Sequence, residues 1–287
     1  MIGKVHASHS MRVRRTQEFL TGVFSTTVAA TVRSEGGRRL LEGSRSTPPL
    51  VSIITVVYRD CFELIPLMET IFSHASSDTE IIVIDGGSSD GTLELLQGWS
   101  AKIDYWLSEK DSGLYEAMNK GISVATGEYI LHMNAGDHLL SIPTAELARC
   151  KTDNIDVACF DVLMDGKNVY HPRAGFILRI DNSWHHQGTF YRRTSHPGYN
   201  TRYRIFGDFD VNQKLYRGGC TVKIFPRIIS GFSTKGISSS GSRRREIYQI
   251  ISRNYGLIYL PIAFIRFQLN TLRRALSSTR RGCSAHK

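Results

Sequence analysis

The sequence has few cysteines, no long apolar run and none of the common glycine-rich phosphate loops. Its five cysteines are widely spaced, odd in number and without a Cys-x-x-Cys pair, which argues against a zinc or redox centre and favours a reduced, cytosolic compartment. No apolar stretch approaches the ~20 residues that a transmembrane helix needs. Neither G-x-G-x-x-G nor G-x-x-x-x-G-K-S/T is present, so a dehydrogenase or a P-loop ATPase loses most of its support.

Charge is plentiful but unevenly placed. The 287 residues carry 36 Lys and Arg against 26 Asp and Glu, a net charge of +10. Residues 1–49 hold 8 basic and 3 acidic side chains, residues 50–241 hold 18 and 22, and residues 242–287 hold 10 and 1. A mildly acidic body therefore carries two basic tails. The net charge is the only argument for nucleic-acid binding, and that charge lies in the two tails and not in the body. We therefore expect no nucleic-acid partner.

The first tail, residues 1–49, is expected to be a basic, disordered extension. Residues 19–32 are uncharged and follow three arginines, so they resemble a signal peptide with an internal start at Met11. Five hydroxyl side chains dilute this stretch, which favours a disordered extension or a misassigned start over export. The serine- and proline-containing residues 43–49 then form a linker.

The second tail, residues 242–287, contains the apolar run YGLIYLPIAFI at 255–265, interrupted by Pro261 and bracketed by arginines on both sides. Apolar and aromatic residues between arginines suit a segment that lies in the interface of an anionic membrane. The alternative is a C-terminal helix that packs on the domain with its arginines in water. We expect an amphipathic helical tail that holds the protein peripherally on the inner face of the cytoplasmic membrane.

The body alternates strand and helix patterns. Continuous apolar runs predict buried strands at 51–57, 80–84, 103–107 and 128–133, and helical spacing predicts helices at 62–74, 92–99 and 113–126. This alternation indicates a three-layer α/β sandwich with a mostly parallel central sheet. Beyond residue 155 the pattern is more mixed, with short strands and one helix that we expect to pack on the same sheet, at 157–164, 168–171, 188–191 and 208–217.

Three acidic residues follow successive predicted strands: Asp85, Asp111 and Asp137. In an open α/β sheet, ligands bind beyond the carboxyl ends of the strands. Any one of these residues alone could be a helix cap or a solvated loop carboxylate. Together they suggest a site that holds a sugar nucleotide and a divalent cation.

Five segments carry a resemblance to a known family. They are VSIITVVYRD (51–60), EIIVIDGGSSDGT (80–92), SEKDSGLYEAMNKGISVATGEYILHMNAGD (108–137), HQGTFYRR (186–193) and YRIFGDFDVNQKL (203–215). In this order and spacing they resemble bacterial family-2 glycosyltransferases, which have the GT-A fold. The likeness is greatest to small non-processive enzymes of exopolysaccharide and lipopolysaccharide O-antigen assembly, the colanic-acid type.

The resemblance implies a GT-A-type domain at 50–241, with a nucleotide-binding half at 50–137 and an acceptor half at 138–241. It covers neither tail. The residues that it assigns to donor binding are Thr55, Val57, Tyr58, Asp85, Gly86, Asp111, Asn119, Asn134 and Ala135. Among these, Asp85 would accept a hydrogen bond from the base, and Asp111 with the start of the following helix would lie near the ribose and diphosphate.

The segment Asn134-Ala-Gly-Asp137 takes the place of the family's Asp-x-Asp motif. Asn134 replaces the upstream Asp and Gly136 replaces the family's next acidic residue, so Asp137 is the only carboxylate left. By resemblance Asp137 would ligate Mg²⁺ or Mn²⁺ together with the diphosphate. With one carboxylate, the ion should bind weakly in the absence of nucleotide.

The catalytic base, by resemblance, is Asp208, with Asp210 as the fallback. Gly207 stands where the family has Glu. The alternative is that Asp208 only caps the helix that begins there. His186 and Gln187 would lie on the acceptor side, and a metal site at the adjacent histidines is less favoured because no third ligand accompanies them.

The resemblance implies an inverting transfer of one sugar from a nucleotide-sugar donor to a glycan or polyprenyl-diphosphate-linked acceptor, in bacterial surface polysaccharide biosynthesis. The Gln-x-x-Arg-Trp motif of processive synthases is absent, so one sugar per encounter is expected. The replaced motif residues keep an alternative open, which is a weakly active or inactive sugar-nucleotide-binding scaffold of a polysaccharide assembly complex.

Overall fold

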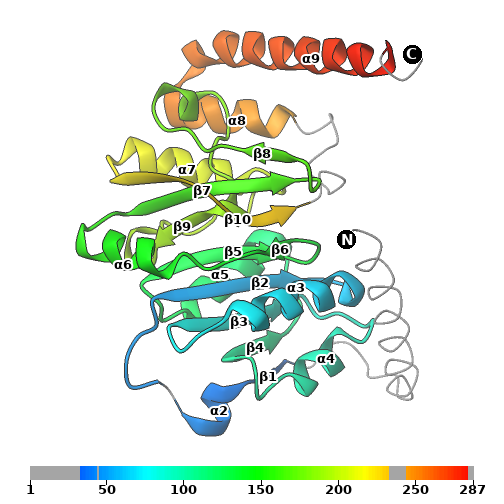
Figure 1. The fold of residues 1–287 in the computed structure, drawn as a ribbon, viewed down its shortest axis with the longest axis vertical. Coiled ribbons are helices and arrows are strands. Elements are labelled where there is room, and N and C mark those ends of the chain that lie inside the picture. The colour runs from blue at the N-terminus through cyan, green and yellow to red at the C-terminus, as the bar shows by residue number, and fades with distance from the viewer. Residues whose placement is uncertain (1–32, 44, 233–243, 284–287) are drawn as a thin grey trace.

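A single sheet runs through the molecule (Figure 1). The structure, a computed structural model, describes residues 33–43, 45–232 and 244–283, and the side chains of the last segment from 245 to 271. The strands lie in the order β1 (Ser34–Gly36), β4 (Tyr105–Ser108), β3 (Thr79–Asp85), β2 (Val51–Val57), β5 (Tyr129–Asn134), β9 (Thr189–Arg192), β7 (Val157–Met164), β10 (Val222–Phe232) and β6 (His138–Leu139), with β8 (Asn168–Tyr170) paired to β7.

The direction of the strands changes along the sheet. The neighbours β4, β3, β2 and β5 are all parallel, as the sequence predicted for its first half. Beyond β5, strand β9 is antiparallel to both of its neighbours, and only β7 and β10 are again parallel. The sheet as a whole is therefore mixed, because β9 runs against both of its neighbours in the middle of the sheet.

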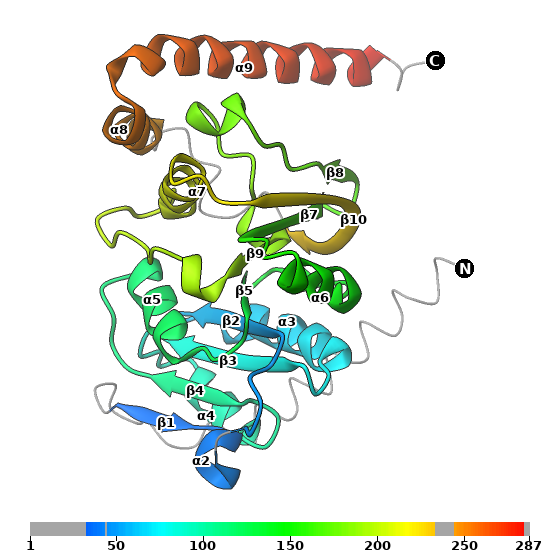
Figure 2. The same ribbon diagram turned by 90° about the vertical axis from the view of Figure 1, so that its left-hand side faces the viewer.

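Helices cover both faces of the sheet and make three layers (Figure 2). One face carries α3 (Cys61–His74), α4 (Thr92–Gly98) and α6 (Thr144–Thr152), whose apolar residues share a core with one side of β2. The other face carries α5 (Leu114–Val124) and α7 (Gly207–Arg217). The three-layer α/β prediction is confirmed, and the second half joins the same sheet as expected.

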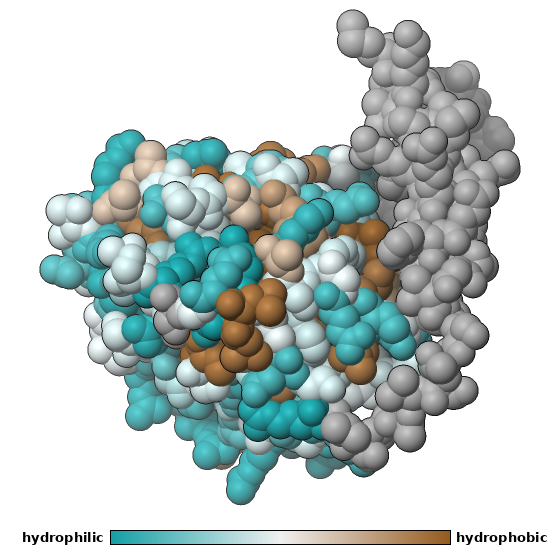
Figure 3. All heavy atoms as spheres, turned by 90° about the horizontal axis from the view of Figure 1, so that it is seen from below, coloured by the Kyte–Doolittle hydropathy of each residue, from teal (hydrophilic) through white to brown (hydrophobic). Residues whose placement is uncertain are grey.

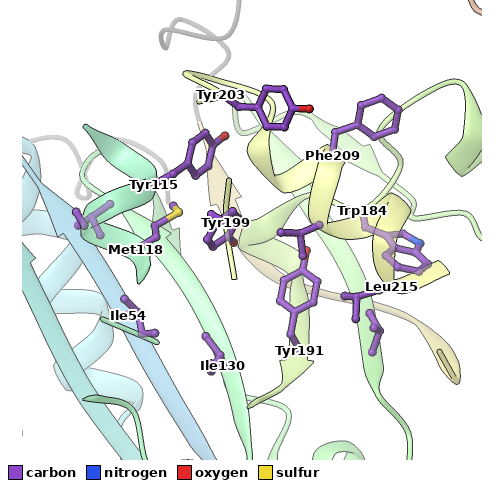
Figure 4. Packing of buried hydrophobic residues seen from close by; sticks show 14 of the residues in the cluster. Ile54, Tyr115, Met118, Ile130, Trp184, Tyr191, Tyr199, Tyr203, Phe209 and Leu215 are labelled. Carbon is purple, nitrogen blue, oxygen red and sulfur yellow. The ribbon is translucent and has the colours of Figure 1, made fainter. Parts of the chain in front are cut away.

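The core on the α5 side is rich in aromatic rings (Figure 4). Ile54 of β2 faces α5 so closely that a Cβ on Gly121 would lie 2.4 Å from its side chain. Further along, Tyr115 stacks on Tyr199 with ring centroids 5.0 Å apart. This close approach of helix to sheet holds the start of α5 next to the loops that precede α7.

Helix α6 and strand β10, in the second half of the body, were not predicted from the sequence. Helix α6 has a largely polar surface and buries only Leu147 and Cys150, so its apolar pattern is weak. Strand β10 contains Pro226, where its pairing with β7 shifts register between Phe225 and Ile228. A proline inside a strand pattern lowers the strand prediction, although a bulge accommodates it.

The first tail is ordered further upstream than expected. Residues 34–36 form β1, which pairs with β4, and α2 (Arg38–Glu42) follows directly. Arg38 and Arg45 both donate to the buried carboxylate of Asp104 at 2.9 and 2.8 Å. The prediction of disorder up to residue 49 was therefore wrong from Ser34 onward, because the buried acids of the sheet require these arginines. Residues 1–32, with the signal-peptide-like stretch, lie outside the described residues.

The second tail is helical, as expected. It consists of α8 (Arg244–Tyr255), the short turn η6 (Leu257–Tyr259) and α9 (Leu260–Cys283). Pro261 lies in the first turn of α9, where a missing N–H costs nothing, so the proline starts the helix and does not break it. Within the part of the chain that the structure covers, no helix combines the length and the apolarity needed to cross a membrane.

The buried pair of Arg39 and Glu80 gives a stability prediction. Arg39 donates to the Glu80 carboxylate, which also accepts from Ser52 and Thr126 and is almost completely buried. Arg39→Ala should lower the free energy of unfolding by about 3 kcal/mol, because a buried charge loses its counter-charge. The double variant Arg39→Ala/Glu80→Gln should recover part of that loss.

Urea denaturation measures these differences. The matched control is Lys223→Ala, which removes a mostly exposed ion pair with Asp153 and should cost less than about 1 kcal/mol. Equal losses for Arg39→Ala and Lys223→Ala would contradict the structural role of the buried pair.

His196 gives a pH prediction. It is packed against His132 and Tyr199, and burial lowers its pKa from 6.5 to about 4. The unfolded chain takes up a proton near pH 6.5, whereas the folded chain keeps this ring neutral until about pH 4. The stability from the neutral ring is thus complete above pH 6.5 and is lost as the pH falls towards 4, by about 3 kcal/mol in total.

Thermal unfolding between pH 7 and pH 4 tests this dependence. His196→Gln should unfold with a shallower pH dependence than the wild type. His74→Gln, at an exposed position of α3, should leave the slope unchanged. A His196→Gln slope as steep as that of the wild type would contradict the assignment.

Candidate active site

The ends of the parallel strands bring the predicted residues to one edge of the sheet. The register pairs Val57 with Asp85, Asp85 with Ser108, and Val56 with Asn134. Because these strands are parallel, their carboxyl ends and the loops that follow lie side by side. Asp111 follows β4, and Asp137 closes the turn after β5. The register therefore supports the predicted convergence of the three acids.

Asp85 forms the buried floor of this edge. Its carboxylate accepts hydrogen bonds from the backbone N–H and hydroxyl of Ser88 and from the hydroxyl of Ser108, the last at 2.6 Å. The side chain has no exposed surface. These donors fix the orientation of the carboxylate at the end of β3.

Gly86, Tyr58 and Asp111 lie against one another beside Asp85. A Cβ on Gly86 would lie 2.8 Å from an oxygen of Asp111 and 3.2 Å from the ring of Tyr58. Burial raises the pKa of Asp111, which also lies near the charges of Glu116 and Asp85, while the Gly113 N–H and Lys120 act in the opposite direction. Tyr58 is largely exposed, so a planar ring is available at the rim of this edge.

Two predicted donor residues are placed differently. Thr55 lies inside β2, two residues before the strand ends, and is completely buried. Asn119 of α5 uses its amide to donate to the carbonyl of Tyr199 at 2.9 Å and to accept its N–H at 2.8 Å. Neither side chain therefore points to the strand ends. Asn119 instead holds the backbone of the loop at Tyr199 by two hydrogen bonds.

The turn from Asn134 to Asp137 is closed by its own hydrogen bonds. The Asn134 N–H donates to the Asp137 carboxylate at 2.8 Å, and Gln187 donates to the other oxygen at 3.3 Å. Gly136 has φ +90°, a conformation that favours glycine over the family's acidic residue. Ala135, between them, packs against the core on the α3 side.

His186 links this turn to α7. Its Nε2 lies 3.0 Å from the side-chain nitrogen of Asn134, and its Nδ1 lies 3.6 Å from the carboxylate of Asp208. An amide nitrogen only donates, so Nε2 accepts and the proton of the neutral ring sits on Nδ1, facing Asp208. Asn134, His186 and Asp208 thus form one continuous contact.

The charges around His186 reinforce this arrangement. Burial disfavours its protonation, but the hydrogen bond and charge of Asp208, with the charge of Asp137, outweigh burial and raise its pKa. Burial also raises the pKa of Asp137, against the influence of His186. The ring therefore lies between two carboxylates that both favour its charged form.

Asp208 and Asp210 point to different surroundings. Asp208 accepts from the Asn182 side chain at 2.9 Å and faces His186. Asp210 is completely buried, pairs with Lys214 at 2.6 Å and accepts from Asn254 of α8 at 3.0 Å. Only Asp208 faces the strand-end residues, while Asp210 fastens α7 to α8.

The sequence around these residues matches a known protein family. The model of glycosyl transferase family 2 matches residues 52–206, which is 155 of the 287 residues. The chain belongs to glycosyl transferase family 2.

Relatives of this family-2 glycosyltransferase span much of the chain. The PGL/p-HBAD biosynthesis glycosyltransferase of Mycobacterium bovis (strain BCG / Pasteur 1173P2) is 30% identical over 195 residues, which cover 63% of this chain and 75% of the relative. The cholesterol galactosyltransferase of Borreliella burgdorferi is 33% identical over 112 residues, which cover 38% of this chain and 31% of the relative.

Solved structures show the same fold at low sequence identity. The mannosyltransferase PcManGT from Pyrobaculum calidifontis, in complex with GDP-Man and Mn²⁺, matches with a TM-score of 0.58 at 17% identity, over 82% of this chain and 76% of that one. S. aureus TarS 1–349 in complex with UDP-GlcNAc matches with a TM-score of 0.57 at 16% identity, over 71% of this chain and 66% of that one. The chain thus spans just under two thirds of TarS 1–349. The GT-A-type fold is confirmed.

The glycine in place of the family's Glu has a packing explanation. The ring of Tyr115 lies against Gly207, where a Cβ would be 2.7 Å from the ring. The Tyr115 hydroxyl also accepts the Gly207 N–H at 2.7 Å. Tyr115 therefore fills the space of a side chain at 207 and fixes the first turn of α7, so Asp208 keeps its position.

Two side chains that contact the candidate site, Asn182 and Arg204, were not predicted from the sequence. The side-chain amide nitrogen of Asn182 donates to Asp208, and the side-chain oxygen of Asn182 accepts from Asn212. The side-chain oxygen of Asn212 accepts from the Tyr191 hydroxyl. Arg204 donates to the carbonyl of Ser112 at 3.0 Å, which places a cation at the start of α5. Asn182 and Arg204 lie in irregular segments without periodicity, so no pattern singled them out.

Gly86 provides a test of the donor side of the transferase. Gly86→Ala should raise the KM for the donor about tenfold or more, because the added methyl would displace Asp111 and Tyr58. Gly98→Ala is the matched control, since nothing lies within 4 Å of its Cβ position. Steady-state kinetics with the donor varied measures both, and an unchanged KM for Gly86→Ala would contradict this placement.

Proposed function

We propose that the chain transfers one sugar from a nucleoside-diphosphate sugar to an acceptor hydroxyl, with inversion at the anomeric carbon. The observation that carries the proposal is the continuous contact from Asn134 through His186 to Asp208. It joins the turn that replaces the Asp-x-Asp motif to the residue that matches the family's base.

The donor would lie along the carboxyl edge of β2, β3 and β4. Tyr58, Gly86 and Asp111 would hold the nucleoside above the buried Asp85. The free N–H groups at the start of α5, with the guanidinium of Arg204, would face the diphosphate. The nucleotide sugars bound in TarS and PcManGT support this class of donor.

The donor set fits a weakly held hard cation. Asp137 offers a carboxylate, and the side-chain oxygens of Asn134 and Gln187 are buried and accept no hydrogen bond from the residues that the structure describes. Oxygen ligands suit Mg²⁺ and Mn²⁺, and a bound diphosphate would complete the set. When bound, the ion would supply positive charge to the leaving diphosphate.

The chemistry is a single displacement. The acceptor oxygen attacks the anomeric carbon as the bond from that carbon to the diphosphate oxygen breaks, and the bonding electrons leave with the nucleoside diphosphate. The hydroxyl proton passes to the carboxylate of Asp208. Asn182 and His186 hold that carboxylate in place. One displacement inverts the configuration of the carbon.

The acceptor we favour is a glycan or a lipid-linked glycan of bacterial surface polysaccharide assembly. A relative named for cholesterol galactosylation supports an acceptor with an apolar part. A lipid-linked acceptor would require the enzyme to work at the surface of a membrane, on its cytoplasmic side. The absence of the processive motif supports transfer of a single sugar.

A second candidate is a sugar-nucleotide-binding scaffold without turnover. The observation that favours it is the loss of three acidic motif residues, at Asn134, Gly136 and Gly207. Release of nucleoside diphosphate from a panel of donors, with and without Mn²⁺, separates the two. Donor binding without any release would support the scaffold.

Asp208→Asn tests the catalytic base. Turnover should fall by about 10²–10⁴-fold, because general-base help has that magnitude, while donor affinity should stay near that of the wild type. Asp210→Asn is the matched control on the same helix. It should lower the melting temperature through the lost Lys214 pair but keep turnover within a few-fold.

Donor binding by calorimetry and turnover by product release are measured on the same preparations. Near-normal turnover of Asp208→Asn would remove this residue from the mechanism. Equal losses for the two variants would show that stability of α7, and not its chemistry, governs the rate.

A further inference from the structure

The outermost element of the molecule has an apolar outer face. Helix α9 lies at one end, with α8 between it and α7 (Figures 1 and 2). Four residues at helical spacing, which we call the outer stripe, are 77%, 41%, 57% and 50% exposed: Ile258, Ile262, Ile265 and Leu269. Isolated exposed apolar residues are ordinary, but three on one face of α9, with Ile258 of η6 directly before them, mark an interaction surface.

The opposite face of α9 is already packed. Ala263 is completely buried, and Phe267 contacts the ring of Tyr248 from α8 at a centroid distance of 6.0 Å. Arg266 pairs with Asp181 at 2.9 Å. One face of α9 is therefore packed against the protein, whereas the outer stripe has no packing partner in the described part of the chain.

The charge around the outer stripe has one sign. Residues 242–287 carry 10 basic residues and a single acid, Glu246. Glu246 is occupied inside the molecule, where it accepts the backbone N–H groups of Arg204, Ile205 and Phe206. No acidic side chain of the tail is left to offset its arginines, so the tail as a whole presents positive charge with apolar side chains.

This combination favours an anionic lipid surface over a second copy of the chain. In a symmetric dimer through α9, two tails with a net charge of +9 each would face one another, and their repulsion would oppose the contact. Anionic headgroups neutralise the arginines, and the acyl region accepts the isoleucines. Since α9 is not apolar enough to span a bilayer, it would lie along the surface.

The same helix is joined to the proposed base by a short series of contacts. Arg266 of α9 holds Asp181, and the next residue, Asn182, donates to Asp208. Arg179, in the same loop, donates to the Tyr259 hydroxyl of η6 at 2.7 Å. The loop that positions Asp208 is therefore fastened directly to the helix that carries the outer stripe.

From these observations we infer that the outer stripe docks the enzyme on an anionic bilayer, with α9 lying in the headgroup region. The docked helix holds the acceptor side of the site next to the membrane, where a lipid-linked acceptor would be found. The membrane role rests on the proposed function for its purpose, but the binding itself can be tested without it.

Vesicle co-sedimentation of the full chain tests the inference. The probes are vesicles of phosphatidylcholine alone and vesicles with about one third phosphatidylglycerol. Wild-type protein should bind the anionic vesicles at least about tenfold more strongly than the neutral ones. Ile262→Asp/Ile265→Asp should lose at least about tenfold in binding to the anionic vesicles.

The control variant is Leu41→Asp in α2, at the other end of the molecule. Leu41 is 67% exposed, and this end, seen from below in Figure 3, shows apolar groups only in small patches among hydrophilic ones. Leu41→Asp should bind vesicles like the wild type. Arg273→Glu/Arg274→Glu, which keeps the outer stripe, should lose the preference for anionic lipid.

Each result supports or overturns the inference. Wild-type protein that ignores both vesicles, or a stripe variant that binds as well as Leu41→Asp, would overturn it. A stripe variant that turns a dimer into a monomer in sedimentation velocity would also overturn it, in favour of a second copy. Circular dichroism and melting temperature confirm that each variant is folded.

Nucleoside diphosphate release without vesicles separates the two proposals. The stripe variant should release product at the wild-type rate in vesicle-free buffer, because none of its residues contacts the site. Vesicle binding by a wild-type protein that releases no product from any donor would overturn the proposed function and leave the docking surface intact.

Discussion

The parallel pairing of β2 with both β3 and β5 determines where chemistry can take place in this molecule. β2 is buried on both faces; β3 pairs with it from Val51 to Val57, and β5 pairs with it from Val51 to Val56. A parallel arrangement brings the exits of all three strands to the same edge. Asp85, Asn134 and the loops that follow them therefore lie at one edge although they are far apart in the sequence, and the position of the proposed donor half follows from this pairing.

The proposed acceptor half depends on a second constraint. Buried polar side chains near the strand ends must form their hydrogen bonds with other groups of the protein. Asn182, Asn212 and Tyr191 satisfy one another beneath Asp208. His186 then connects that network to the turn at Asn134. Buried polar networks are costly unless they are complete, and this one is anchored on a sheet strand and a helix. The proposed base is held by rigid elements and not by a loop alone.

The sequence contained most of the fold and part of the site. Apolar runs such as 51–57 and the spacing in 113–126 predict their elements because burial imposes those patterns on the chain. Segments whose order depends on distant partners were out of reach. In the sequence, residues 34–42 look like part of a basic, disordered extension, because the buried acids Asp104 and Glu80 that pair with their arginines are known only from the structure.

The candidate site also contains both residues that local sequence patterns predict and residues that only tertiary contacts bring into place. Asp85, Asp111, Asp137, His186 and Asp208 come from motifs. The first three lie at or just beyond the ends of β3, β4 and β5, and His186 contacts Asp208 at the start of α7. Asn119 comes from the same motifs, yet its amide is consumed by the backbone of Tyr199. Asn182 and Arg204 carry no local pattern, since only the tertiary fold brings them to Asp208 and to α5. The choice between Asp208 and Asp210 likewise needed the neighbours of α7, which the sequence does not reveal.

The short strand β1 has a consequence for how the protein stays dispersed. It covers the outer edge of β4, whose backbone groups would otherwise offer a template to any extended chain in solution. β1 itself is only three residues long, contains the charged Glu35 and directly follows Arg33. It is therefore a poor template for pairing with a further strand. A protein that began at residue 50 would expose the β4 edge and tend to associate strand to strand, even with every residue of the site in place.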